Sequence, residues 1–183
     1  SLLAQSDVRT RRAWRTFRGT WVVNGGDLTQ TATTGTDLAT WRLAPLTGDT
    51  AITARMRYTA DGAGTGDRGP GLLFNGATAD RLPGTQMITY TFDGSYLKWG
   101  WFDASGAFIY QGGAHVPSGA DGQPHDVGAI LHGATYDVTL DGQTLATDVP
   151  IAPAHGDHVG LIDTTAHAVF ESLTITTLPA SAS

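Results

Sequence analysis

Apolar and polar residues alternate along most of this sequence, and the alternation indicates β-strands. In residues 50–58 the apolar side chains fall on one face of the run, while Thr53, Arg55 and Arg57 fall on the other. This is the pattern of a strand with one buried side. About thirteen runs of strand length follow one another between residues 20 and 176, and none shows the length and period of a helix. The pattern therefore predicts an all-β chain.

Turn residues separate these runs and predict how they are connected. Asp141-Gly142 lies between the runs 136–140 and 144–147, and Asp93-Gly94 joins another such pair nearer the middle of the chain. An Asp-Gly step between two alternating runs is a strong signal for a β-hairpin. The 24 glycines also suit a chain of many tight turns. Short strands joined in this way predict a two-sheet antiparallel jelly-roll β-sandwich.

The sequence divides into three parts, of which the middle one carries the strand pattern. Residues 1–18 lack the alternation and predict an N-terminal arm, residues 19–177 predict the β-sandwich domain, and residues 178–183 predict a flexible tail. A chain of 183 residues fits one domain and can bury most of its apolar surface in a single core. Because cysteine is absent, disulfides and thiolate metal sites are excluded.

Five segments of this strand pattern carry a resemblance to a known fold family. They are residues 19–28, 71–74, 136–142, 160–162 and 170–175. In this order they resemble the concanavalin A-like lectin/glucanase superfamily, especially its laminin G-like and carbohydrate-binding members. The resemblance implies two packed, curved sheets with a glycan site on the concave face or on loops at one edge. It also implies a structural calcium ion in many members, but no diagnostic calcium motif occurs in this sequence.

The carboxylates argue against glucanase-type catalysis. Glycoside hydrolases of the resembling superfamily use a pair of carboxylates on one strand, and retaining chemistry needs them about 5–5.5 Å apart. Glu171 is the only glutamate, and no strand carries such a pair. The cluster His155-Gly-Asp-His158 is consistent with a metal-binding loop, but Gly156 and Asp157 are also what an ordinary turn requires. We therefore expect no catalytic residues, no specific metal site and no cofactor.

Aromatic residues concentrate around the hairpin of residues 86–102 and suggest a binding surface. Trp99 and Trp101 lie two apart on one strand and so share a face, opposite Tyr96. Aromatic rings can stack on sugar rings while polar side chains bind the hydroxyls. Alternatively, the two tryptophans fill the core of the sandwich. The candidate ligand-binding residues are Trp99, Trp101, Tyr96, Tyr90, Asp93, Asp103, Tyr110 and Gln111.

Charge is distributed unevenly and gives a second functional hypothesis. The net charge is −6, yet the arm is rich in arginine, whereas no lysine or arginine follows Lys98. A basic arm ahead of an acidic body is consistent with docking onto a neighbouring copy, as in a virion decoration or fibre protein or a cell-surface assembly. An acidic body disfavours nucleic acid. The arm residues are Arg9, Arg11, Arg12, Arg15 and Arg18.

These observations converge on a non-catalytic β-sandwich as the first hypothesis. Its expected partner is a polysaccharide or surface glycan, and its expected location is extracellular or surface-displayed. No apolar stretch approaches the roughly 20 residues of a transmembrane helix, so membrane insertion is not expected. The alternative is a structural assembly subunit held to its neighbours by the N-terminal arm.

Overall fold

Fifteen β-strands and no helix make up the described part of a computed structural model of the chain. The structure describes residues 2–6, 15–16, 21–24, 27–30, 36–42, 49–59, 69–76, 82–92, 94–152, 156, 158–164 and 168–178. The strands are β1 (Leu2–Ser6), β2 (Arg15–Thr16), β3 (Trp21–Asn24), β4 (Asp27–Gln30), β5 (Thr36–Arg42), β6 (Thr50–Tyr58), β7 (Gly69–Gly76), β8 (Gln86–Thr91), β9 (Tyr96–Phe102), β10 (Phe108–His115), β11 (His125–His132), β12 (Thr135–Leu140), β13 (Gln143–Pro150), β14 (His158–Thr164) and β15 (Ala168–Thr177).

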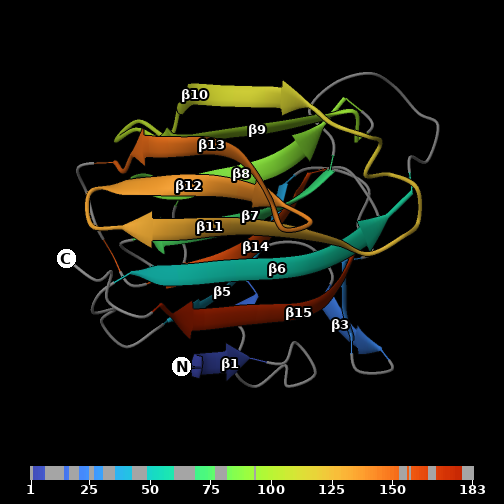
Figure 1. Ribbon diagram of the computed structural model, residues 1–183. Helices are drawn as coiled ribbons and strands as arrows, with labels where there is room; N and C mark the ends of the chain where they lie inside the picture. Colours follow the sequence, from blue (N-terminus) through green and yellow to red (C-terminus); the bar gives the residue numbers. More distant parts are fainter. Residues whose placement is uncertain are drawn as a thin grey trace.

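The strands form two antiparallel sheets packed face to face (Figure 1). Sheet A has the order β13-β12-β11-β6-β15-β4-β3, with β1 also paired to β15. Sheet B has the order β10-β9-β8-β7-β14-β5-β2 and lies behind sheet A in Figure 1. The predicted jelly-roll β-sandwich is therefore confirmed. In both sheets, strands that are distant in sequence pair with each other, such as β6 with β15 and β7 with β14.

Alternation along the strands builds the core between the sheets. In β6 the predicted apolar face is buried, whereas Arg55 on the opposite face is exposed. Strand β12 repeats the pattern, with Tyr136 and Val138 buried and their neighbours half-buried. The largest fully buried side chains include Tyr90, Tyr136, Phe74 and Phe170. Burial of such rings supplies much of the hydrophobic stabilisation of a small core.

The two Asp-Gly signals give hairpins, as predicted. At the β12–β13 turn, Asp141 has φ = 50° and Gly142 has φ = 81°. This left-handed backbone at two successive positions is what a tight hairpin turn requires and what Asp-Gly tolerates. Strands β8 and β9 also pair in register across their turn, although Asp93 itself lies outside the described residues.

Two short strands lie within residues 1–18, where the sequence pattern indicated none. Strand β1 pairs with β15 at the edge of sheet A, and β2 pairs with β5 at the edge of sheet B. Arg15 begins β2, whereas the predicted arm residues Arg9, Arg11, Arg12 and Arg18 and the tail residues 179–183 lie outside the described residues. Edge pairing needs backbone hydrogen bonds but no apolar alternation, because an edge strand need not bury one face. The boundaries of the predicted arm, domain and tail remain a prediction.

A second apolar cluster covers part of the outer face of sheet B. It consists of Leu73, Met87, Phe102 and Ile162, with Leu82 and Phe108 packed against it. These residues alternate with core residues along their strands, for example Leu73 between Leu72 and Phe74. The outer face of sheet B is therefore apolar where that of sheet A, with Arg55 and Arg57, is charged.

Candidate functional site

Strand β9 distributes its aromatic side chains between the core and the outer face of sheet B. Trp99 is buried in the core beside Leu97, with 4% of its surface exposed. Tyr96 and Lys98 alternate with these residues and so point away from sheet A. Trp101 lies on the inner side, half-buried and paired with Ile109 of the edge strand β10. The core alternative for Trp99 is thus the arrangement that the structure adopts.

The outer aromatic side chains of β9 and β10, together with Phe92, form two groups of rings on one face, which we call the aromatic strip. The hydroxyl groups of Tyr96 and Tyr110 are 2.7 Å apart, the length of a good O–H···O hydrogen bond. The ring of Tyr96 also lies edge-on to His115 at 5.0 Å and to Phe92 at 5.9 Å. The strip consists of Phe92, Tyr96, Phe102, Phe108, Tyr110 and His115.

Glycines in β9 and β10 let these rings lie flat on the sheet. A Cβ atom at Gly113 would lie 2.4 Å from the ring of Tyr96, and one at Gly100 would lie 2.7 Å from the ring of Phe108. Both distances are too short for a side chain, so each ring occupies the space above a glycine on the neighbouring strand. The glycine positions therefore set the height and orientation of the strip.

A hollow of about 180 Å³ adjoins the strip on the same face of sheet B. Its lining combines apolar walls with hydroxyl and ammonium groups. Lys98 lies between hollow and strip, with Nζ 4.9 Å from the centre of the Phe108 ring, a cation–π distance. Thr89 in the floor donates its hydroxyl hydrogen to the carbonyl of Pro70 at 3.2 Å. The lining residues are Leu82, Met87, Thr89, Tyr90, Lys98, Phe102, Ile162 and Thr164.

The pKa of Tyr110 supports a role for its hydroxyl as a neutral polar contact. The hydrogen bond to Tyr96, and then desolvation, raise the pKa of Tyr110 above its ordinary value. A protonated tyrosine hydroxyl can both donate and accept hydrogen bonds. A ring that carries such a hydroxyl offers an apolar face and a polar edge at the same place.

The other predicted ligand-binding residues do not join this surface. Tyr90 is buried in the core, and Gln111 turns inward, where its Nε2 donates to the Pro150 carbonyl at 2.7 Å. Asp103 accepts hydrogen bonds within its own turn, from the Ser105 hydroxyl at 2.6 Å, Ala107 N at 3.0 Å and Ser105 N at 2.9 Å, and these contacts lower its pKa. Of the eight residues predicted, Tyr96 and Tyr110 are brought together on the outer face. Their role as a binding site remains a prediction.

Four members of the strip were not among the predicted residues. They are Phe92, Phe102, Phe108 and His115. Alternation along β9 places Phe102 on the same face as Tyr96. The sequence pattern alone could therefore have identified Phe102 as a member of the strip. The β10 residues were obscured by a register shift between Tyr110 and Gly112, which breaks the simple two-residue period.

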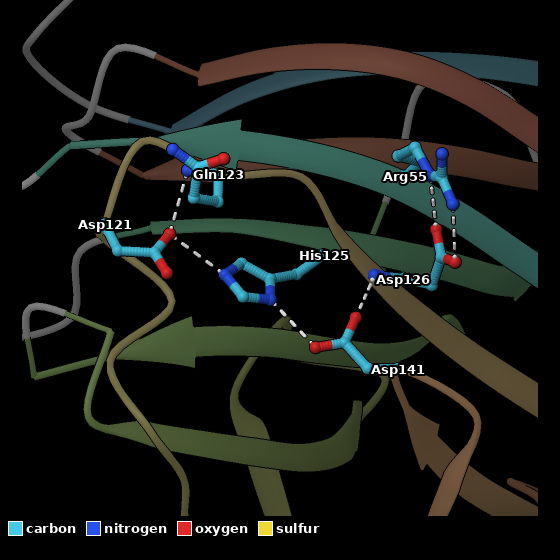
Figure 2. A network of polar contacts seen from close by, with 6 residues as sticks. All are labelled: Arg55, Asp121, Gln123, His125, Asp126 and Asp141. Atoms are coloured by element: carbon cyan, nitrogen blue, oxygen red, sulfur yellow. Dashed lines mark hydrogen bonds and ion pairs between the residues drawn. The ribbon is translucent and has the colours of Figure 1, made fainter.

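A separate polar cluster at one end of β11 surrounds His125 (Figure 2). Its Nδ1 atom lies 2.8 Å from Asp141 and its Nε2 atom 3.0 Å from Asp121. Burial disfavours the charged imidazole, but the hydrogen bonds and charges of Asp141 and Asp121 outweigh it and raise the pKa of His125. Because both ring nitrogens face carboxylates, the protonated form of this histidine is favoured and both nitrogens are engaged in hydrogen bonds.

The single glutamate of the chain belongs to a charge pair. Glu171 accepts a hydrogen bond from Arg57 Nε at 3.0 Å on sheet A, far from the aromatic strip. Among the described residues no group of three or more His, Asp or Glu side chains is placed to hold a metal ion. Of the cluster His155-Gly-Asp-His158, His155 and Asp157 lie outside the described residues, so its metal-binding role stays a hypothesis.

Comparison with solved structures identifies the fold. A carbohydrate-binding module, CBM66 from Bacillus subtilis, is 16% identical, with a TM-score of 0.70 over 90% of this chain and 96% of that one. The carbohydrate recognition domain of Emp46p, in its metal-free form, is 11% identical, with a TM-score of 0.67 over 97% of this chain and 95% of that one. The exoplasmic/lumenal domain of VIP36, bound to Ca²⁺ and Man3GlcNAc, is 8% identical, with a TM-score of 0.64 over 95% and 87%.

The chain therefore has the concanavalin A-like sandwich fold, as the sequence resemblance implied. At these identities the likeness establishes the fold alone. Neither the comparison with protein-family models nor that with curated protein sequences gives a match.

Proposed function

We propose that this chain is a carbohydrate-binding β-sandwich that holds a glycan on the outer face of sheet B. The observation that carries the proposal is the Tyr96–Tyr110 pair, whose hydroxyls meet at 2.7 Å beside a hollow lined by both apolar and polar groups. Sugars expose apolar C–H faces and polar hydroxyl edges. A row of rings next to hydroxyl and ammonium groups matches both.

The neighbouring structures support this ligand class. CBM66 is named a carbohydrate-binding module, Emp46p contributes a carbohydrate recognition domain, and VIP36 was solved with Man3GlcNAc. The partner proposed for this chain is accordingly a polysaccharide or surface glycan. The VIP36 domain is exoplasmic or lumenal, which supports an extracellular or surface-displayed location here. No helix in the described part of the chain is long and apolar enough to cross a membrane.

Binding without catalysis is the second part of the proposal. Glycosidase chemistry of the usual kind requires two carboxylates flanking the scissile bond. Asp103, directly after β9, caps its own turn, and Glu171 lies on the other sheet with Arg57. The VIP36 complex contains Ca²⁺. Among the described residues of this chain, no group of three or more His, Asp or Glu side chains is placed to bind such an ion, and the proposed glycan contacts do not involve a metal ion.

A glycan array followed by calorimetric titration tests the proposal. Tyr110→Ala and Tyr96→Ala should each lower affinity for the bound glycan by about tenfold, because each removes a stacking ring and a hydroxyl. Thr144→Ala, an exposed substitution on β13 of sheet A, is the matched control and should leave affinity unchanged. Absence of binding to any glycan, or equal affinity in all variants, would contradict the proposal.

A further inference from the structure

We infer that the aromatic strip binds an extended polysaccharide chain along β9 and β10 rather than a single terminal sugar. This inference rests on the proposed function and specifies the shape of its ligand. The relevant occupant is a linear oligosaccharide with several units in contact at once. The length of the strip, the placement of its rings on one face and their exposure carry the inference.

The strip is much longer than one sugar ring. Strand β9 alone has 7 residues, which span about 20 Å at the usual rise of a strand. Phe102 lies at one end of the strand and Tyr96 at the other, and Phe92 extends the row beyond Tyr96. A terminal monosaccharide would contact a fraction of this length.

The rings form two groups on one face, and the side chain of Lys98 lies between them, with Nζ 4.9 Å from the centre of the Phe108 ring. Phe102 and Phe108 are 5.4 Å apart, and the Phe108 ring lies over Gly100, the residue that pairs with Tyr110. Tyr110 in turn contacts Tyr96 through its hydroxyl, and Tyr96 contacts Phe92. Successive stacking surfaces at such intervals can support successive sugars of one chain.

The register shift in β10 is what keeps its rings on one face. Between Tyr110 and Gly112 the chain gains one residue relative to β9. Gln111, at this bulge, points into the sandwich and donates to the Pro150 carbonyl. Because Gln111 and Gly112 both fall on the inner side, Tyr110 and His115 both remain on the outer face.

The strip is exposed at its Phe92 end and near its middle, whereas Phe102 at the other end is 8% exposed. Phe92 is 55% exposed and Tyr110 is 56% exposed, values that are high for large apolar side chains. His115 at the Phe92 end and residues 104–107 beyond Phe102 are also exposed. A chain lying on the strip can therefore continue past these residues, which a site for chain ends would prevent.

Calorimetric titration with oligosaccharides of increasing length tests this inference. The probes are β-1,3-glucan, β-1,4-glucan and β-1,4-mannan oligosaccharides, from monosaccharide to hexasaccharide. For the series that binds, affinity should rise about tenfold or more between disaccharide and hexasaccharide, as further rings become occupied. Tyr110→Ala, near the middle of the strip, should weaken binding of both lengths.

Phe92→Ala provides the decisive comparison. This variant should weaken the hexasaccharide by about threefold to tenfold and the disaccharide by clearly less, because Phe92 lies at the end of the strip and a short ligand can occupy the other rings. Ile109→Ala is the matched control, since Ile109 is also a partly exposed apolar residue of this hairpin but belongs to the inner side of β10. Its hexasaccharide affinity should equal that of the unmodified chain.

The two possible failures are distinguishable. If binding is sensitive to Tyr110→Ala but disaccharide and hexasaccharide bind equally well, the extended-chain inference is overturned and the proposed function stands. If none of the probes and no glycan on the array binds, both are overturned. Thermal unfolding of each variant, followed by circular dichroism, shows whether the variant is folded.

Discussion

The imidazole of His125 is clamped against Asp141, with Nδ1 and Oδ2 2.8 Å apart. Asp121 holds the opposite ring nitrogen at 3.0 Å, so the side chain ties the loop after β10 to the turn between β12 and β13. Asp141 Oδ1 also accepts the backbone N–H of Asp126 at 2.7 Å, and Asp126 in turn pairs with Arg55 (Figure 2). One histidine thus connects three segments at one end of the sandwich.

This clamp predicts that the chain loses stability as the pH rises from about 6.5 through the raised pKa of His125. The pKa of His125 is raised in the folded chain, so its contribution is fully present below the unfolded value of about 6.5 and disappears as the pH passes the folded pKa. Asp121, whose pKa is lowered first by the N–H of Gln123 and then by His125, stays charged in mild acid. The contribution should be about 1 kcal/mol, because the carboxylates are partly exposed.

Urea unfolding of the chain and of His125→Gln across pH checks this prediction. The difference in unfolding free energy should be largest between about pH 4 and 6.5 and should shrink at higher pH. Asp141→Asn is the control, because asparagine tolerates the left-handed backbone at this turn while removing the charge. It should lower the pKa of His125 in an NMR titration. If the difference in unfolding free energy between the unmodified chain and His125→Gln grew with rising pH, the predicted direction of the pH dependence would be wrong.

A polar network inside the sandwich predicts graded losses of stability. Tyr136 donates its hydroxyl hydrogen to Gln111 Oε1 at 2.7 Å, and Gln86 accepts the N–H of Ala152 at 2.6 Å and donates to the Gly100 carbonyl at 2.9 Å. Tyr136→Phe should cost about 1–2 kcal/mol, because Gln111 keeps other partners. Gln86→Met should cost more, about 2–3 kcal/mol, because it leaves buried backbone groups unpaired.

Denaturant unfolding of both variants measures these costs. The exposed substitution Thr144→Ala should change the free energy of unfolding by less than about 0.5 kcal/mol and serves as the reference. Equal losses for Gln86→Met and Tyr136→Phe would show that the network does not distribute its hydrogen bonds as the distances indicate.

Sequence patterns predicted the sheet architecture well because they reflect local periods. The alternation in β6 and the Asp141-Gly142 turn both depend on neighbours within a few residues, and the structure confirms both. The binding surface depends on relations that the sequence does not display. The bulge that turns Gln111 inward and the long-range contact of His125 with Asp141 each follow from packing between distant segments.

The same limit explains the mixed outcome for the aromatic residues. Trp99 and Tyr96 both lie on β9, and alternation correctly separated them onto opposite faces. Which face looks toward sheet A is decided by the second sheet, not by β9. The structure places Trp99 inside, and the candidate surface moves to Tyr96 and its neighbours.

Substitution of a glycine under the strip should disturb glycan binding without removing any aromatic residue. In Gly113→Ala the new Cβ atom would lie 2.4 Å from the Tyr96 ring, so the ring must move away from the sheet. The proposed site should then lose about tenfold in affinity or more, as the spacing between Tyr96 and Tyr110 changes. Calorimetry with the best array glycan measures this loss. Unchanged affinity would show that the position of Tyr96 does not matter for binding.

The N-terminal segment calls for a test that separates charge from structure. Deleting residues 1–18 would remove β1 and β2, which pair with β15 and β5. Loss of a multimer after such a deletion could therefore result from damaged sheets. Replacing the arginines leaves the backbone pairing in place, because strand pairing uses main-chain groups.

The sharper experiment replaces Arg9, Arg11, Arg12, Arg15 and Arg18 by glutamine in the full chain. If the arm docks onto the acidic body of a neighbouring copy, the unmodified chain should form multimers that dissociate with increasing salt, because exposed ion pairs are screened. The substituted chain should then be monomeric at all salt concentrations. Analytical ultracentrifugation gives the masses, and circular dichroism gives a check on folding. If the unmodified chain is monomeric at high concentration and low salt, the assembly role is ruled out. Glycan binding is then the function to pursue.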